Sequence, residues 1–222
     1  MSFWRQTAAL VRAQTRSETR TGEVLLVVLP FGAAALFVIP MAVGADSALL
    51  QRVGPGLFWM VVLLFGIVVT QRRTAHPSGA RSDLLRMLAV DPAARFTATA
   101  VVNWALLIAF EIVVGLVMIV LYDPVLTGWA WLVLVVPLSA AGLALVGTLA
   151  GSIADGAGVR TTLVPLLVLP VAIPLLLAAA QATEGLRLGT GILRWVLLLA
   201  ITDLVLAIAG VLTARPLEES DS

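Results

Sequence analysis

The chain has 222 residues, of which 60% are hydrophobic and only 12% charged, and its formal net charge is +1. Soluble domains carry roughly 25% charged residues, so this composition and a mean hydropathy of +1.06 exclude a water-soluble core and predict an all-α integral membrane protein. Cysteine and lysine are both absent, which excludes disulfides, thiolate chemistry, Schiff-base lysines and the lysine of a Walker A nucleotide site.

Residues 1–23 are predicted to form an amphipathic helix at the membrane interface. Apolar residues alternate there with arginines in a rough helical rhythm. These residues are Phe3, Trp4, Leu10 and Val11, with Arg5, Arg12, Arg16 and Arg20. Such a helix places its apolar groups at the headgroup boundary and its arginines toward phosphate. The alternative is an unstructured basic arm.

The first two transmembrane spans are predicted at 24–44 and 54–70, with a short loop between them that carries Asp46 and Arg52. A run of about 20 apolar residues crosses the hydrocarbon core of a bilayer. A cleaved signal peptide is the alternative for the first span. We expect no cleavage, because the leader and the apolar run are both longer than those of ordinary signal peptides.

Residues 71–98 form the longest polar interval and carry five arginines against two acids. Arginines close to helix ends resist translocation, so this interval is predicted to lie in the cytoplasm. Within it, residues 82–90 are predicted to form a short helix that begins at Ser82 and is stopped by Asp91-Pro92.

Four further spans are predicted at 99–122, 129–154, 161–182 and 191–214. A turn at 155–160 and a short loop with Glu184 and Arg187 connect the last three. Residues 24–214 are therefore expected to form a six-helix bundle, and the whole chain 1–222 one transmembrane domain. The acidic tail 215–222 is expected to be disordered.

The arginines also predict the orientation of the chain. With six spans both termini lie on one side, and eleven arginines fall on that side against three on the other. The positive-inside rule therefore places the N- and C-termini in the cytoplasm. We expect a multi-pass protein of the bacterial inner membrane.

Several short motifs resemble the haem exporter protein B (CcmB) family, and they occur in the family's order along nearly the whole chain. They are Phe3-Trp4-Arg5, Gly54-Pro55-Gly56-Leu57-Phe58-Trp59, Arg72, Trp104, Gly128-Trp129 and the stretch from Leu167 to Leu176, which reads LVLPVAIPLL. The chain departs from the family pattern at Gln71, where an acidic residue is usual, at Glu111, where an apolar residue or proline is usual, and in its basic rather than acidic loop.

The resemblance implies the permease subunit of an ABC transporter of the ABC-2-like exporter type, with no ATPase activity of its own. It implies a role in cytochrome c maturation, either in exporting haem or in releasing a haem-loaded chaperone. The implied partners are two copies of a separate ATPase subunit that binds ATP, a second copy of the chain and other cytochrome c maturation membrane subunits. Haem is implied as cargo, without a permanently bound cofactor, and no nucleic-acid partner is expected.

Two carboxylates are predicted near the middle of the bilayer, Glu111 in the third span and Asp203 in the sixth. A charged side chain at the bilayer centre costs about 2.5–3.5 kcal/mol on insertion scales, and such residues usually face the bundle interior. Asn103 precedes Glu111 by two helical turns, so this side of the helix is partly polar. The two interpretations are a translocation face or site that protonates during transport, and a structural hydrogen-bonded contact.

Pro165, Pro170 and Pro174 repeatedly interrupt the fifth span. Interrupted helices suit a moving or cavity-lining element, but a static kink is the interpretation that we favour. His76 is the only histidine and lies in a loop without other ligands at metal-binding spacing, so no metal site is predicted.

The predicted helix at 82–90 is the candidate for ATPase coupling, because it is cytoplasmic and joins two spans directly. Leu84, Leu85 and Leu88 are expected to fill a groove on the ATPase, with Arg81 and Arg86 at the rim. The alternative is a helix on the lipid surface. For the whole chain, the alternatives are an ABC-2-type drug or lipid exporter permease and a non-transporting membrane assembly scaffold.

Overall fold

The computed structural model describes residues 3–219 except 22, 45, 75–90, 126–127 and 157–159, with side chains left out near several of these gaps. Every element in the described part is helical. The elements are α1 (Phe3–Thr21), α2 (Glu23–Val43), α3 (Ser47–Thr74), α5 (Pro92–Tyr122), a 3-10 turn at Trp129–Trp131, α6 (Leu132–Gly156), α7 (Arg160–Leu188) and α8 (Leu193–Glu219).

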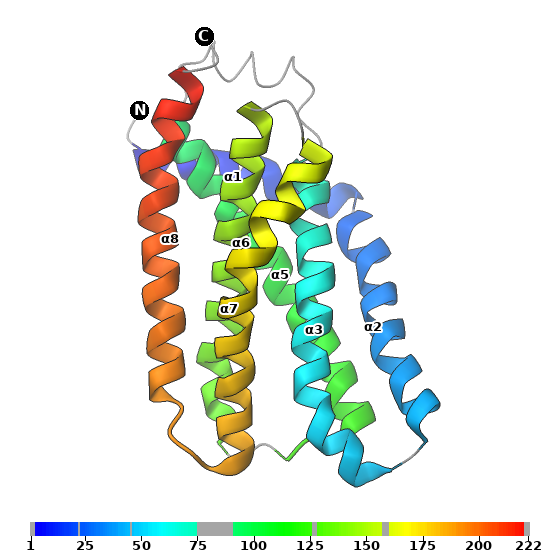
Figure 1. Cartoon of the computed structure of the whole chain (residues 1–222). Helices are drawn as coiled ribbons and strands as arrows, with labels where there is room; N and C mark the ends of the chain where they lie inside the picture. The colour runs from blue at the N-terminus through cyan, green and yellow to red at the C-terminus, as the bar shows by residue number, and fades with distance from the viewer. Residues whose placement is uncertain are drawn as a thin grey trace.

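Six of these helices lie side by side, and α1 lies across one end of the bundle (Figure 1). Both ends of the chain lie at that same end. Helices α5 and α6 share the centre: α5 packs against α1, α2, α3, α6 and α8, and α6 packs against α3, α5, α7 and α8. The prediction of a helix near residues 1–23 is confirmed as α1, whereas its place at a membrane interface stays a prediction.

Five helices are long and apolar enough to cross a membrane, and they include the predicted second to sixth spans. The apolar part of α2, Leu26–Ala42, is shorter. The all-α class is therefore confirmed, while a crossing by α2, the count of six crossings and the cytoplasmic side of the termini remain predictions.

Helix α5 begins earlier than predicted, and the reason is its cap. Asp91-Pro92 was expected only to stop the preceding helix, but Pro92 is the first residue of α5. Asp91 is its N-cap, and its Oδ1 accepts a hydrogen bond from the Ala93 backbone nitrogen at 3.0 Å. An aspartate cap followed by proline at the first helical position is a strong helix start, so residues 92–98 belong to α5 and not to the loop.

Three other helices extend beyond their predicted ends, because helices continue past the apolar run when polar residues still favour them. Arg52 lies on α3, which starts at Ser47. Glu184 and Arg187 lie on the last turns of α7, where they form an ion pair with Arg187 Nε 2.9 Å from Glu184 Oε2. Helix α8 runs to Glu219, so the disordered tail predicted at 215–222 is wrong as far as that residue.

The only tyrosine of the chain connects α5 to α2. Pro40 has no N–H, so the carbonyl of Leu36 loses its helical donor, and the Tyr122 hydroxyl donates to that carbonyl at 2.8 Å. The Tyr122 ring packs against Gly54 of α3, where an added Cβ would lie 3.0 Å from the ring. The glycine of the GPG motif therefore has a packing role at the end of the bundle away from α1.

Candidate functional site in the bundle interior

The candidate site starts from two polar residues on one side of α5. Asn103 is fully buried and Glu111 is 1% exposed. They are eight residues apart, which is about 12 Å along a helix axis. Both therefore face the interior of the bundle, as predicted, but at two different depths.

Helix α6 supplies a hydroxyl partner at each depth. The Asn103 Nδ2 donates to Thr148 Oγ1 at 3.0 Å, and Ser139 Oγ donates to Glu111 Oε2 at 3.1 Å. Ser139 Oγ also lies 2.9 Å from the Val136 carbonyl. A serine hydroxyl carries a single proton, so its bond to Glu111 competes with a bond to its own helix.

An apolar layer separates the two polar contacts. Leu107 lies between Asn103 and Glu111 on α5 and is fully buried. A Cβ added to Gly66 of α3 would lie 3.3 Å from Leu107 Cδ2 and 3.5 Å from Leu143 Cδ1 of α6. The partly polar side expected on this helix is thus two separate polar levels closed off from one another by leucines.

Asp203 reaches α6 from the other side, out of α8. A Cβ added to Gly142 would lie 2.7 Å from Asp203 Oδ1 and would also clash with Leu175 of α7. Gly142 is one helical turn beyond Ser139, the partner of Glu111. The two carboxylates therefore contact α6 at nearly the same depth, as expected from their positions in their spans.

These buried groups keep unused hydrogen-bonding capacity. Within the described part of the chain, Asn103 Oδ1, Glu111 Oε1 and both carboxylate oxygens of Asp203 have no hydrogen-bond partner. A buried acceptor without a donor costs about 1–3 kcal/mol. Such groups need an explanation beyond packing, and in a membrane bundle they mark candidate functional sites.

The prolines of α7 lie elsewhere. Pro170 and Pro174 are on the exposed side of the helix, and α7 continues unbroken through both. The side chain of Pro165 lies outside the described residues. A moving or cavity-lining role for these prolines stays a prediction.

The predicted coupling residues Arg81, Leu84, Leu85, Arg86 and Leu88, and also His76, lie outside the described residues. In the ranges that are described, no group of three or more His, Cys, Asp or Glu side chains could hold a metal ion.

The sequence analysis missed Ser139, Gly142 and Thr148 of α6. Serine and threonine in apolar helices commonly bond back to their own backbone, as Thr148 does to the Ala144 carbonyl at 2.6 Å, so their presence alone gave no signal. Ser139 and Thr148 are nine residues apart and Asn103 and Glu111 eight, so the spacing allows two contacts between these helices, and the observed pairs Asn103–Thr148 and Glu111–Ser139 show that α5 and α6 run antiparallel.

Comparison with known proteins covers the whole bundle. The family model described as "CcmB protein" matches residues 5–220. A protein named "Heme exporter protein B" from Bradyrhizobium diazoefficiens is 30% identical over 188 residues, which is 82% of each chain. Its namesakes from Paracoccus denitrificans and Haemophilus influenzae are 28% and 27% identical, over 94% and 81% of this chain and 97% and 82% of their own lengths.

Together with the five apolar helices, these similarities make the chain a multi-pass membrane protein. The match over nearly its full length means that the chain belongs to the CcmB protein family.

Proposed function

We propose that this chain is the permease subunit of an ABC transporter in cytochrome c maturation. It exports haem or releases a haem-loaded chaperone, and a separate ATPase subunit drives it. The observation that carries this proposal is the family match over residues 5–220, together with relatives named as haem exporters. The lack of lysine supports it, since the chain has no Walker A lysine of its own.

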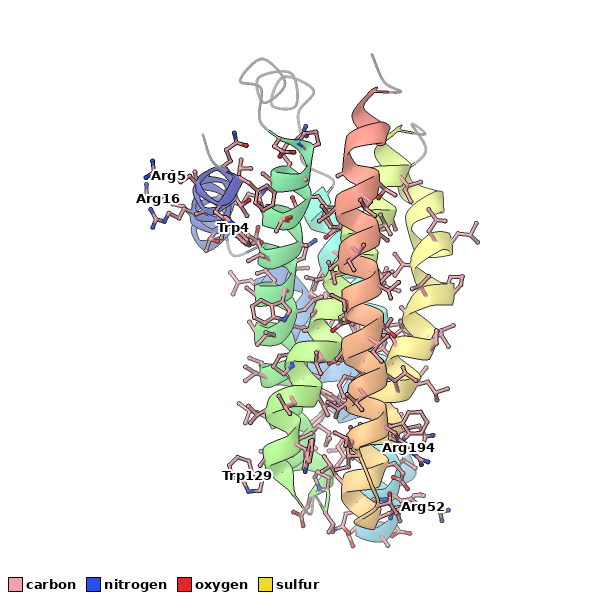
Figure 2. The ribbon with its side chains drawn as sticks, turned by 90° about the vertical axis from the view of Figure 1, so that its left-hand side faces the viewer. Trp4, Arg5, Arg16, Arg52, Trp129 and Arg194 are labelled. Carbon is pink, nitrogen blue, oxygen red and sulfur yellow. The ribbon has the colours of Figure 1, made fainter. Side chains whose placement is uncertain are left out.

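The proposed membrane arrangement has six crossings, with both termini in the cytoplasm of a bacterium and the bundle in the inner membrane. The 17 apolar residues of α2 measure about 26 Å as a helix and fall at the lower end of known spans. Arg5 and Arg16 lie at the end with α1, and Arg52 and Arg194 at the other (Figure 2). Reporter fusions after Gly79 and Gly189 test this arrangement, because they must report opposite sides.

The proposed ATPase contact uses residues 82–90, with Leu84, Leu85 and Leu88 as apolar anchors and Arg81 and Arg86 at the rim. A protein without a nucleotide site is driven only through contacts that differ between the states of a partner that has one. The working unit in this proposal is a dimer of the chain with two ATPase subunits, together with other cytochrome c maturation subunits.

The proposed translocation face consists of Asn103, Glu111 and Asp203. Their unpartnered acceptor oxygens supply hydrogen-bonding capacity inside the bundle, and leucines lie between the levels of Asn103 and Glu111. Haem acts as cargo in this scheme and not as a resident cofactor.

The decisive experiment expresses the chain with its candidate ATPase and reads both complex formation and c-type cytochrome maturation. Leu85→Asp is expected to abolish recovery of the ATPase, whereas Arg86→Ala weakens it modestly and in a salt-dependent way. An ATPase that is recovered equally with both variants contradicts the proposed contact. If Leu85→Asp stops cytochrome maturation but an ATPase that cannot hydrolyse ATP still supports it, the chain acts as a passive scaffold.

A further inference from the structure

Helix α1 is joined to α5 by two side-chain hydrogen bonds. The Gln6 Oε1 accepts from the Asp91 backbone nitrogen at 3.1 Å, and Gln14 Nε2 donates to Thr99 Oγ1 at 3.4 Å. The two bonded residues on each helix are eight positions apart, which corresponds to about 12 Å along the axis of α1 and about 12 Å along the axis of α5. A two-point attachment of matched spacing fixes the position of α1 along α5 as well as its rotation.

The rest of α1 agrees with this attachment. Thr7 is buried and Val11 packs against the core, so the side of α1 that carries the glutamines packs against the bundle. The opposite side carries arginines, and Arg5 points away from the bundle (Figure 2). Both amide side chains of α1, those of Gln6 and Gln14, therefore form hydrogen bonds with residues of α5 or its cap.

Gln6 bonds to Asp91, the N-cap residue at which α5 begins. Asp91 caps α5 through its side chain, and its carbonyl accepts from the Arg95 nitrogen at 3.1 Å. Its own N–H precedes the first helical hydrogen bond, so no carbonyl of α5 can accept it. Gln6 supplies the acceptor, and any pull from residues 75–90 acts on a residue that α1 holds.

Helix α5 can carry such a displacement inward. It is continuous over 31 residues, and its only proline is at the first position. At 1.5 Å per residue, Asn103 lies about 18 Å and Glu111 about 30 Å from Asp91 along the axis. A helix without an internal break moves both polar residues together when its start moves.

We propose that α1 and α5 move as one body, and that Gln6 and Gln14 are positioning residues that hold the start of α5. Work delivered to the chain before Asp91 then reaches Asn103 and Glu111. The inference rests on the proposed function in one respect, namely that an ATPase delivers that work.

The first test removes the attachment with the near-isosteric change Gln6→Met together with Gln14→Met. ATPase recovery is expected to stay at the level of the unchanged chain. The amount of mature c-type cytochrome formed per ATP hydrolysed is expected to fall at least fivefold. Gln6→Glu keeps an acceptor oxygen and is expected to retain most of the coupling. Thr15→Val, on the exposed side of α1, is the matched control and leaves coupling unchanged.

The second test uses the absence of native cysteine. Gln14→Cys with Thr99→Cys removes one bond and lowers coupling, and a short reducible thiol cross-linker between the two is expected to restore it. Thr15→Cys with Thr99→Cys is the control pair and is expected not to cross-link. Restoration of coupling by the covalent link without a change in the unfolding midpoint is the result that a purely structural role of the glutamines does not produce.

Two results overturn the inference: normal coupling in the double methionine variant, or loss of coupling on cross-linking, which would mean that α1 must leave α5. If the methionine variant does not fold, the cross-linked cysteine pair decides alone. If no ATPase is recovered even with the unchanged chain, the proposed function fails instead. Hydrogen exchange over 91–96 then tests the attachment, which requires faster exchange in Gln6→Met and slower exchange on cross-linking.

Discussion

Helices α5 and α7 are similar in length, with 31 and 29 residues, but they differ in proline content and in the residues that they bury. Helix α5 has no proline after its first position and carries Asn103 and Glu111 into the core. Helix α7 contains three prolines, and the two whose side chains are described lie on its exposed side. Its buried side near them consists of small and aliphatic residues such as Ala172, Leu175 and Ala179.

The difference between these helices shows that proline content does not indicate which helix of this bundle buries Asn103 and Glu111. Pro170 and Pro174 have no N–H, so the backbone carbonyls of residues 166 and 170, four positions earlier, lose their helical hydrogen-bond donors. The buried Asn103 and Glu111 instead lie on α5, which has no proline after its first position.

The largest expected effect comes from making α5 resemble α7. Ala105→Pro is placed on an exposed position between Asn103 and Glu111, so the ring meets no core atom, but it frees the Val101 carbonyl. A proline inside a helix costs about 3 kcal/mol or more. We expect a clear drop in the unfolding midpoint in detergent and loss of cytochrome maturation.

The converse change, Pro170→Ala with Pro174→Ala, is the control for α7. It restores two helical donors on the exposed side, and maturation is expected to persist without loss of stability. A variant that is stable but inactive would show that the two prolines of α7 are needed for function.

A smaller effect is expected where α6, α7 and α8 meet. Gly142→Ala adds a Cβ that would lie 2.7 Å from Asp203 Oδ1 and clash with Leu175, and overpacking of this kind costs about 1–3 kcal/mol. Thermal unfolding in detergent measures the loss. Gly56→Ala on α3 is the matched control, because nothing lies within 4 Å of its added Cβ. Equal stability of the two variants would contradict the close approach of Asp203 to α6.

The smallest effect on stability is expected at Glu111. Glu111→Gln keeps an oxygen that can accept from Ser139, so folding and assembly persist while transport-coupled maturation changes. Removing only the hydrogen bond, by Ser139→Ala, is expected to cost about 1 kcal/mol. If Glu111→Leu expresses well and matures cytochrome normally, the carboxylate is incidental and the proposed translocation face is wrong.

Much of the architecture could be predicted from local composition. Six apolar runs predicted the long helices, of which five are long and apolar enough to cross a membrane, and the motifs from Phe3-Trp4-Arg5 to the proline-rich stretch at 167–176 indicated the family. The depths of Glu111 and Asp203 also followed from their places within their runs. Helix ends were predicted less well, because hydropathy reports where lipid begins and not where the backbone ladder stops, as α5, α7 and α8 show.

The sequence by itself therefore determined the class, the approximate spans, the uneven arginine distribution and the two buried acids, since each depends on residues close together in the chain. Only the tertiary structure decided that Ser139 meets Glu111, that Gly142 meets Asp203, that Tyr122 serves the carbonyl freed by Pro40 and that Gln6 holds Asp91. Those pairings depend on how each helix is rotated about its axis and where it crosses its neighbours. Close packing of side chains from several helices sets both quantities at once, and no single stretch of sequence contains them.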